Sequence, residues 1–181
     1  MLYFIGLGSN LDISRVGSSK NVLEAAVRRI CGEIGTVVKK SQWFESEPIP
    51  VSDQPWFVNG VVAVESDLEP QELLKRTLKI EAEFGRVRSV ANAARTLDLD
   101  VIAAEDLVCD FVANEEGPAI TLPHPRMHER AFVLLPLVQI APDWFHPVLK
   151  KPIAALVTAL PPQNIRIMTD DSPKGDINLA N

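Results

Sequence analysis

The sequence has little cysteine and no long apolar run. Its 181 residues include two cysteines, Cys31 and Cys109, which are too few for a disulfide framework and lack the spacing of a metal site. We expect both thiols to be buried as small apolar side chains. No segment approaches the roughly 18 apolar residues of a membrane span. The first residues, MLYFIGLGSN, carry neither the basic segment nor the cleavage site of a signal peptide. These absences favour a cytoplasmic protein.

Basic charge and phosphate-binding loops are also scarce. The formal net charge is −6 and the pI is about 5.1, which argues against a general binder of nucleic acid or of an acidic membrane. The stretch GLGSN resembles a phosphate loop only superficially. The pattern G-x-G-x-x-G would need a third glycine where Leu11 stands, and the Walker pattern is absent. We interpret GLGSN as a tight turn after a first strand, which disfavours dinucleotide-fold and P-loop chemistry.

The chain has the composition and patterning of one globular domain, with 46% hydrophobic and 23% charged residues. Apolar periodicity predicts strands at residues 2–5, 36–44, 57–64 and 97–102, and helices at about 18–31 and 67–84. The order βαββαβ indicates an α+β fold of the ferredoxin-like type, an antiparallel sheet with two helices on one face. Short strands near 107–112 and helices near 129–140 and 153–160 form C-terminal extensions. We expect a single domain over residues 1–162 and a polar, flexible tail over residues 163–181.

Two aspartates stand close together in the stretch RTLDLDVI. Asp98 and Asp100 alternate with aliphatic residues, so in a strand both carboxylates face the same side. A strand with one solvated face shows the same alternation, and spacing alone does not decide between the two interpretations. Three arginines, Arg86, Arg88 and Arg95, crowd the preceding loop. Carboxylates that hold Mg²⁺ beside arginines that bind phosphate are the components of phosphoryl transfer, and a solvated basic loop is the alternative.

Aromatic and amide side chains could form a second part of a site. Phe57 and Asn59 lie two apart on a predicted strand and share a face, where they could stack on and hydrogen-bond to a planar heterocycle. A core phenylalanine and a strand-end asparagine would give the same pattern. Phe132 beside Arg130, after His124, leaves the same alternatives open.

Five stretches stand out when they are taken together: GLGSNL, DQPWFVNGVVAVES, IEAEFGRVR, RTLDLDVI and LPHPRMHERAFVLLPLVQIAPDW. They cover the chain from its start to about Trp144. In order and in spacing they resemble the 6-hydroxymethyl-7,8-dihydropterin pyrophosphokinase family of folate biosynthesis. The resemblance implies an ATP-dependent enzyme that transfers the β,γ-pyrophosphoryl unit of ATP to the hydroxymethyl group of the pterin and releases AMP.

The resemblance also implies roles for individual residues. Asp98 and Asp100 match carboxylates that bind two Mg²⁺ ions on the ATP phosphates, and Arg86 and Arg95 match catalytic arginines of a loop. The residues that match ATP contacts are Glu81, Arg88, His124 and Arg130. The residues that match pterin contacts are Ser46, Glu47, Ile49, Phe57, Asn59 and Phe132. Phe57 and Phe132 match two rings that enclose the pterin, and Asn59 matches an amide that reads its edge. The implied partners are ATP and the pterin, with no nucleic acid and no membrane.

One loop departs from the family pattern. The family has a basic residue, Trp, Gly and Pro ahead of the arginine matched by Arg95, whereas this chain has Ala91-Asn92-Ala93-Ala94 and is one residue shorter. We therefore predict a loop that closes less firmly over ATP. One alternative function is a divergent paralogue with altered pterin specificity or weak activity. Another is a non-enzymatic ferredoxin-like ligand-binding module, against which the pair Asp98 and Asp100 argues.

Overall fold

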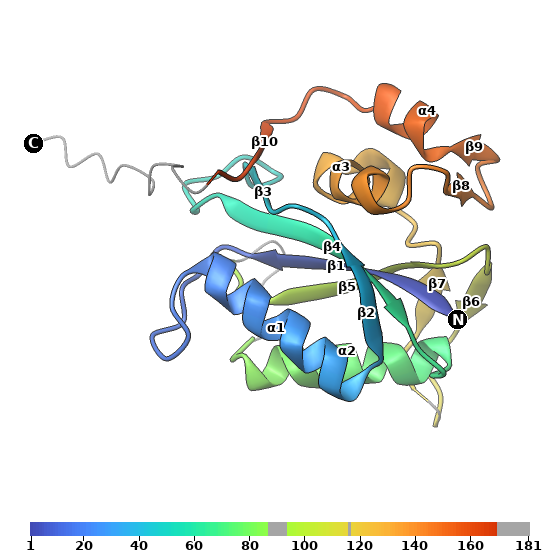
Figure 1. The fold of residues 1–181 in the computed structure, drawn as a ribbon, viewed down its shortest axis with the longest axis horizontal. Helices are drawn as coiled ribbons and strands as arrows, with labels where there is room; N and C mark the ends of the chain where they lie inside the picture. The colour runs from blue at the N-terminus through green and yellow to red at the C-terminus, as the bar shows by residue number, and fades with distance from the viewer. Residues whose placement is uncertain (87–93, 116, 170–181) are drawn as a thin grey trace, which may run out of the picture.

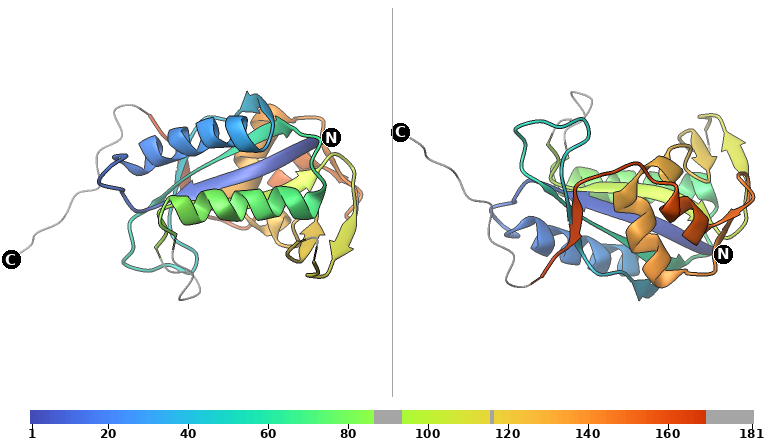
Figure 2. Two further views of the ribbon diagram at one scale, coloured as in Figure 1. Left: turned by 90° about the horizontal axis from the view of Figure 1, so that it is seen from below. Right: turned by 90° about the horizontal axis from the view of Figure 1, so that it is seen from above.

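The computed structural model describes residues 1–86, 94–115 and 117–169, which form three layers around one sheet. Helices α1 (Ser19–Glu33) and α2 (Pro70–Glu83) cover one face of the sheet. On the other side, α3 (Ala131–Ile140) packs on the sheet and α4 (Ile153–Thr158) packs on α3. Figure 2 shows the two helix layers from opposite sides. The prediction of an α+β fold with an antiparallel sheet is confirmed.

The central sheet has six strands: β1 (Leu2–Ser9), β2 (Thr36–Lys40), β3 (Phe44–Ser46), β4 (Phe57–Glu65), β5 (Asp98–Ala104) and β10 (Ile165–Ile167). The order is β10-β3-β4-β1-β5, β2 also pairs with β4, and every pairing is antiparallel. The remaining elements are β6 (Cys109–Phe111), β7 (Ile120–Leu122), the 3₁₀ turn η1 (Met127–Glu129), β8 (Phe145–His146) and β9 (Lys151–Pro152). β6 pairs with β7, and β8 pairs with β9.

Helices cover most of both faces of the sheet, which explains why β4 is an almost continuous apolar run. Val62 and Val64 belong to the apolar core beneath α1 and α2. Val61 and Ala63 belong to a second core beneath α3 and α4. Residues of one strand therefore alternate between two cores. No helix in the described ranges combines the length and apolar composition needed to cross a bilayer. The cytoplasmic location stays a prediction.

Several sequence predictions about local structure were wrong. β1 continues to Ser9, so most of GLGSN is strand and not a tight turn after Ile5. The strand predicted at residues 36–44 is divided into β2 and β3, because Ser41 interrupts it and accepts a hydrogen bond from the backbone N–H of Val61 through its hydroxyl, at 3.0 Å. The predicted tail at residues 163–181 begins with an ordered strand, β10, that joins the sheet beside β3. Residues 170–181 lie outside the described ranges.

The two cysteines are not buried as predicted. Cys31 is exposed and Cys109 is half-buried, and both are free thiols. The buried residues of α1 are Val22, Leu23, Ala26 and Ile30. Cys31 follows the last of these by one position, so it lies away from the face that packs on the sheet.

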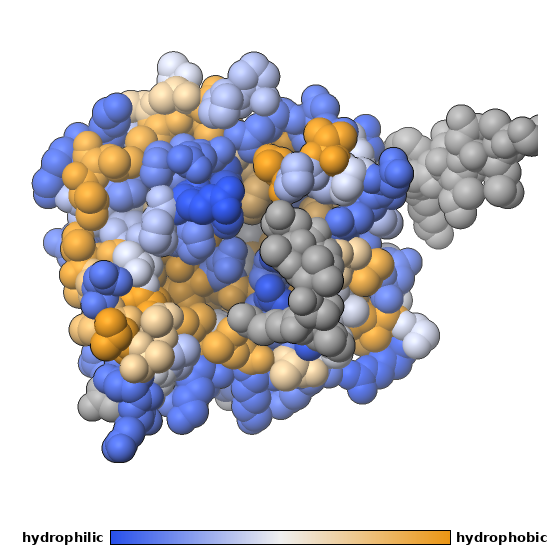
Figure 3. All heavy atoms as spheres, turned by 180° about the vertical axis from the view of Figure 1, so that it is seen from behind, coloured by the Kyte–Doolittle hydropathy of each residue, from blue (hydrophilic) through white to orange (hydrophobic). Residues whose placement is uncertain are grey.

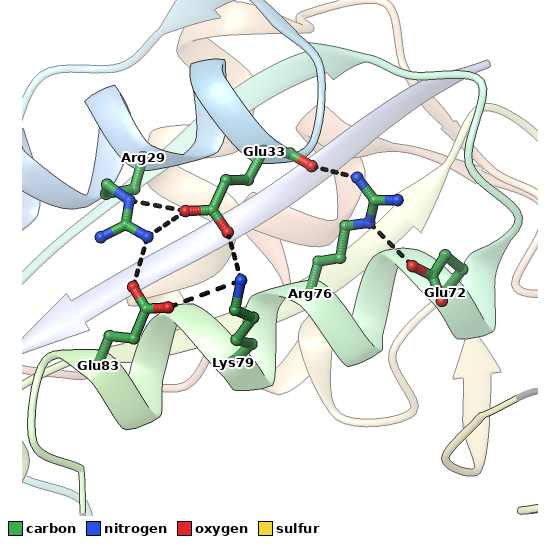
Figure 4. Close-up of polar contacts among 6 residues, drawn as sticks. All are labelled: Arg29, Glu33, Glu72, Arg76, Lys79 and Glu83. Carbon is green, nitrogen blue, oxygen red and sulfur yellow. Dashed lines mark hydrogen bonds and ion pairs between the residues drawn. The ribbon is translucent and has the colours of Figure 1, made fainter.

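Ion pairs join α1 to α2 on the outer surface, as Figure 4 shows. Arg29 of α1 bonds Glu33 and also reaches Glu83 of α2, while Lys79 of α2 lies 3.4 Å from the Glu33 carboxylate. Within α2, Arg76 donates to Glu72 at 2.9 Å. The hydrogen bond from Arg29 lowers the pKa of Glu33, and the hydrogen bond from Arg76 lowers that of Glu72.

We expect Glu33→Gln to lower the melting temperature at pH 7 by about 1–3 °C, because exposed ion pairs contribute little. A carboxylate whose pKa is lowered by folding stabilises the protein above its ordinary pKa of 4.5, and this contribution is lost as the pH falls through the folded value. The difference between wild type and variant should therefore vanish in acid. Glu72→Gln, which breaks pairs within one helix, is the control. A larger loss for Glu72→Gln than for Glu33→Gln would contradict a role in joining the helices.

Candidate active site

A cavity of about 710 Å³ opens beside the N-terminal end of α3. Every predicted site residue that the structure describes lines it: Ser46, Glu47, Ile49, Phe57, Asn59, Glu81, Arg86, Arg95, Asp98, Asp100, His124, Arg130 and Phe132. Arg88 and residues 91–93 lie outside the described ranges. The face in Figure 3 is hollowed near its centre, and hydrophilic and hydrophobic residues meet at the hollow. The structure thus brings the residues together, and their roles stay predictions.

The floor of the cavity is a stretch of the sheet that the α3–α4 layer leaves uncovered. Gly8 of β1 lies opposite Asn59 of β4 and Asp98 of β5. Two residues earlier, Gly6 lies opposite Asp100. Directly paired residues share a face, so Gly8 separates the Asn59 amide from the Asp98 carboxylate, and Gly6 lies beside Asp100 on the same face. A Cβ atom at Gly8 would lie 3.2 Å from Asn59 Oδ1, so glycine keeps this floor open.

The alternation in RTLDLDVI now has a physical explanation. Leu99 and Val101 enter the core beneath α1 and α2, together with Leu97 just before the strand. Asp98 and Asp100 consequently point to the opposite face and into the cavity. The face on which the carboxylates lie is the wall of a cavity and not an open, solvated sheet surface.

Asp98 is surrounded by arginines. Arg86 bonds both Asp98 and Glu81, and Arg95 bonds the other carboxylate oxygen of Asp98. Glu81 is 2% exposed and also accepts a hydrogen bond from the backbone N–H of Leu99 at 2.8 Å. Leu99 lies between the two aspartates in the sequence. The Glu81 carboxylate therefore holds both β5 and the Arg86 side chain in position.

Asp100 has a less complete set of cationic neighbours. It forms an ion pair with Arg130 at 3.6 Å. Burial and the neighbouring charge of Asp98 raise the pKa of Asp100. Burial lowers the pKa of both His124 and Arg130. The Nδ1 atom of His124 accepts a hydrogen bond from the Arg126 backbone N–H at 3.1 Å, which fixes the orientation of the ring.

The two aspartates fit a magnesium site that substrate would complete. Mg²⁺ in phosphate-binding enzymes is held by one or two carboxylates together with substrate oxygens and water. Asp98 and Asp100 supply such a pair. Burial and, after it, the charge of Asp98 raise the pKa of Asp100, and a divalent cation would relieve the repulsion between the two carboxylates. In the described part of the chain, no group of three or more His, Cys, Asp or Glu residues could hold a metal without a substrate.

The aromatic part of the cavity lies beside the polar part. Phe57 and Phe132 are each half-buried, and Phe57 belongs to neither apolar core. The buried Asn59 donates from Nδ2 to the hydroxyl of Ser46 at 2.8 Å. The guanidinium of Arg130 lies 5.6 Å from the centre of the Phe132 ring. The interpretation of Phe57 as a core residue is therefore not supported.

Some contributors were missed by sequence reasoning. Asn10, which is 3% exposed, accepts from the backbone N–H of Arg95 at 2.7 Å through its side chain, and its own backbone N–H donates to the Arg95 carbonyl at 3.0 Å. Gly6 and Gly8 form the open floor. Two glycines at a spacing of two, directly after an apolar strand, were the available signal. Gln163, which also lines the cavity, gave no signal in the sequence.

Comparison with known proteins identifies the family. The model of 7,8-dihydro-6-hydroxymethylpterin-pyrophosphokinase matches residues 4–142. A 2-amino-4-hydroxy-6-hydroxymethyldihydropteridine pyrophosphokinase of Methylorubrum extorquens is 39% identical, covering 77% of this chain and 82% of that protein. The protein of the same name from Bacillus subtilis is 38% identical, covering 76% of each chain.

Two longer proteins contain a similar region. The folic acid synthesis protein fol1 of Schizosaccharomyces pombe is 37% identical over 80% of this chain, which spans 19% of fol1. A solved structure of Plasmodium falciparum HPPK-DHPS with pteroate shares the fold with a TM-score of 0.68 at 14% identity, covering 87% of this chain and 42% of that one. The chain therefore belongs to the 7,8-dihydro-6-hydroxymethylpterin-pyrophosphokinase family.

Proposed function

We propose that this protein transfers pyrophosphate from ATP to the hydroxymethyl group of 6-hydroxymethyl-7,8-dihydropterin and releases AMP, a step of folate biosynthesis. One observation carries the proposal. A single cavity holds paired carboxylates and arginines at one part and half-buried aromatic rings beside a buried amide at another. The first part suits a triphosphate with Mg²⁺, and the second suits a planar heterocycle.

On the phosphate side, we assign Asp98 and Asp100 to hold two Mg²⁺ ions, which would neutralise and orient the ATP phosphates when bound. Arg86 and Arg95 lie on Asp98, so their guanidinium groups are already at the position where phosphate charge would arrive. Arg130 lies 3.6 Å from Asp100, His124 lines the same cavity, and both would contact the nucleotide. Arg88 is assigned to ATP from the family resemblance alone.

Glu81 is better explained as a brace than as an ATP ligand. Its nearly buried carboxylate accepts from Leu99 N–H and from Arg86, both of which belong to the protein. We therefore propose that Glu81 acts on ATP through Arg86 and through the strand that carries Asp98 and Asp100. This revises the role implied by the resemblance.

On the heterocycle side, Phe57 and Phe132 would stack on the pterin and Asn59 would bond its edge. Ser46, Glu47 and Ile49 line the same part of the cavity. The hydrogen bond from Asn59 to Ser46 leaves the Asn59 Oδ1 atom directed at the open floor near Gly8. A pterin carries ring N–H and amino groups, and Asn59 Oδ1 could accept a hydrogen bond from one of them. The order β1-α1-β2/β3-β4-α2-β5 supports assigning the ferredoxin-like arrangement to the core.

The direct test is AMP formation from ATP and Mg²⁺ with and without 6-hydroxymethyl-7,8-dihydropterin. We expect AMP to form in an amount that matches the pterin consumed. AMP release that is independent of the pterin, or ADP as the product, would overturn the proposal. Ligand binding without any turnover would favour the non-enzymatic module instead.

We expect Phe57→Ala to weaken pterin binding by about three- to tenfold, since a stacked aromatic contributes about 0.5–1.5 kcal/mol beyond the area that it buries. Affinity for ATP and the melting temperature should change little, because Phe57 is outside both cores. Binding can be measured by calorimetry with an ATP analogue present. Phe145→Ala, at a half-exposed phenylalanine away from the cavity, is the control. Equal losses for pterin and ATP with a lower melting temperature would indicate a packing role.

A further inference from the structure

The C-terminal strap, residues 163–167, lies outside the region matched by the family model, which ends at residue 142. In Figure 1 the chain leaves α4, passes above α3 and runs into β10 beside β3. The strap thus spans from the α3 side of the cavity to the sheet edge that carries Ser46. Gln163 and the preceding Pro161 line the cavity itself.

At one end, the strap holds the backbone on both sides of Arg130. The Gln163 side chain accepts a hydrogen bond from the Ala131 N–H at 3.0 Å and donates one to the Glu129 carbonyl at 2.9 Å. Ala131 begins α3, so its N–H has no acceptor within the helix and Gln163 supplies one. The two hydrogen bonds are to the residues on either side of Arg130, and Ala131 directly precedes Phe132.

At the other end, the strap holds the segment that carries the pterin-side residues. The backbone N–H of Glu47 donates to the Asn164 carbonyl at 3.0 Å, and Asn164 Nδ2 donates to the Glu47 carboxylate at 2.6 Å. Ile165 pairs with Ser46 in the β10–β3 register. Ser46 in turn bonds Asn59. The strap therefore connects the Arg130–Phe132 side of the cavity to the Ser46–Asn59 side.

We propose that this strap sets the spacing between the two sides of the substrate cavity, with Gln163 as the positioning residue for Arg130 and Phe132 and Asn164 as the positioning residue for Glu47. The inference rests on the proposed function. Its basis is that neighbouring residues of one segment make side-chain bonds to both sides while lining or bordering the cavity. Asn164 and Arg166 are exposed and Gln163 is half-buried, so apolar burial is not what holds Gln163 and Asn164 in place.

The chain provides a closely matched control in Gln139, near the opposite end of α3. Its side chain also makes two hydrogen bonds, accepting from the Gln42 backbone N–H at 3.0 Å and donating to the Gln42 side chain at 3.1 Å. Gln139 does not line the cavity. Gln163→Ala and Gln139→Ala thus remove the same side chain and the same number of bonds from two ends of one helix.

The experiment measures kcat and KM for each substrate at a temperature well below the melting temperature of every variant. We expect Gln163→Ala to lower kcat/KM for the pterin by about tenfold, the order associated with one or two lost hydrogen bonds. Gln163→Met, which keeps the length of the side chain but neither bond, should behave like Gln163→Ala. Asn164→Ala should raise KM for the pterin while leaving KM for ATP unchanged. Gln139→Ala should match wild type in all constants.

The outcomes separate this inference from the proposed function. If wild type is active and both Gln163 variants match Gln139→Ala, the positioning role is wrong and the proposed function stands. A loss of melting temperature in the Gln163 variants with unchanged kinetic constants would likewise overturn the positioning role. A wild-type chain that forms no AMP in the presence of the pterin would overturn the proposed function and the inference with it.

Discussion

Replacing Asp100 with asparagine is expected to reduce AMP formation by about a thousandfold or more while the fold is retained. Metal ions stabilise several kcal/mol of charge in such transition states, and each 1.4 kcal/mol or so corresponds to a factor of ten. An amide keeps the shape of the carboxylate but lacks the negative charge that would hold Mg²⁺. Asp98→Asn should cause a similar loss. Asp110→Asn, on the exposed hairpin strand β6, is the control and should be fully active.

Asp100→Asn and Asp98→Asn should change the melting temperature in opposite directions, which gives a second test of the metal assignment. Burial and Asp98 raise the pKa of Asp100 above its ordinary 3.8, so its ionised form is disfavoured in the folded protein. Stability therefore falls as the pH rises through the ordinary and then the folded pKa, and the full penalty is present well above both. Asp100→Asn should remove that penalty and raise the melting temperature at neutral pH without metal.

Asp98→Asn should instead lower the melting temperature, because Arg86 and Arg95 both lose a charged partner. AMP assays across a Mg²⁺ titration and metal-free thermal melts measure the two effects. Near-normal turnover of Asp100→Asn at saturating Mg²⁺ would contradict the assignment of Asp100 as a magnesium ligand.

The strands and long helices could be predicted because burial on two faces leaves a pattern in the sequence. Leu99 and Val101 alternate with Asp98 and Asp100, and the structure sends the first pair into a core and the second into the cavity. The family motifs in the sequence predicted which residues line the cavity. Sequence reasoning could not show that Asp98 is already paired with Arg86 and Arg95, since that depends on how a loop folds back onto a strand.

The missed elements had weak local signals. The strap gains its contacts from partners 117 and 121 positions earlier in the chain, at Glu47 and Glu45, and its polar residues show no periodicity. The sequence predicts a tight turn at GLGSN, since glycine usually disfavours a strand. Here β1 tolerates Gly6 and Gly8 because both of its edges are paired, with β4 and with β5. What glycine provides at these positions is an uncovered floor.

Arg95 offers a second large effect with a different signature from the aspartates. Its backbone is fixed by Asn10 and its guanidinium rests on Asp98, so the charge is placed before substrate arrives. Preorganised cationic donors act mainly where negative charge develops during transfer. Arg95→Ala should therefore lower kcat by about 100- to 1,000-fold. Affinity for ATP should fall by less than about fivefold, because an accessible ion pair contributes little to ground-state binding.

Two further substitutions separate charge from geometry in this prediction. Arg95→Lys keeps the charge but not the planar pair of donors, so its kcat should lie between those of wild type and Arg95→Ala. Arg76→Ala removes an arginine of the α1–α2 surface (Figure 4) and should leave kcat unchanged. Turnover measured at saturating substrates and calorimetry with a non-hydrolysable ATP analogue give the two quantities. If ATP affinity falls by the same factor as kcat, Arg95 binds the nucleotide equally in the ground state and the transition state, and its assignment as a catalytic group fails.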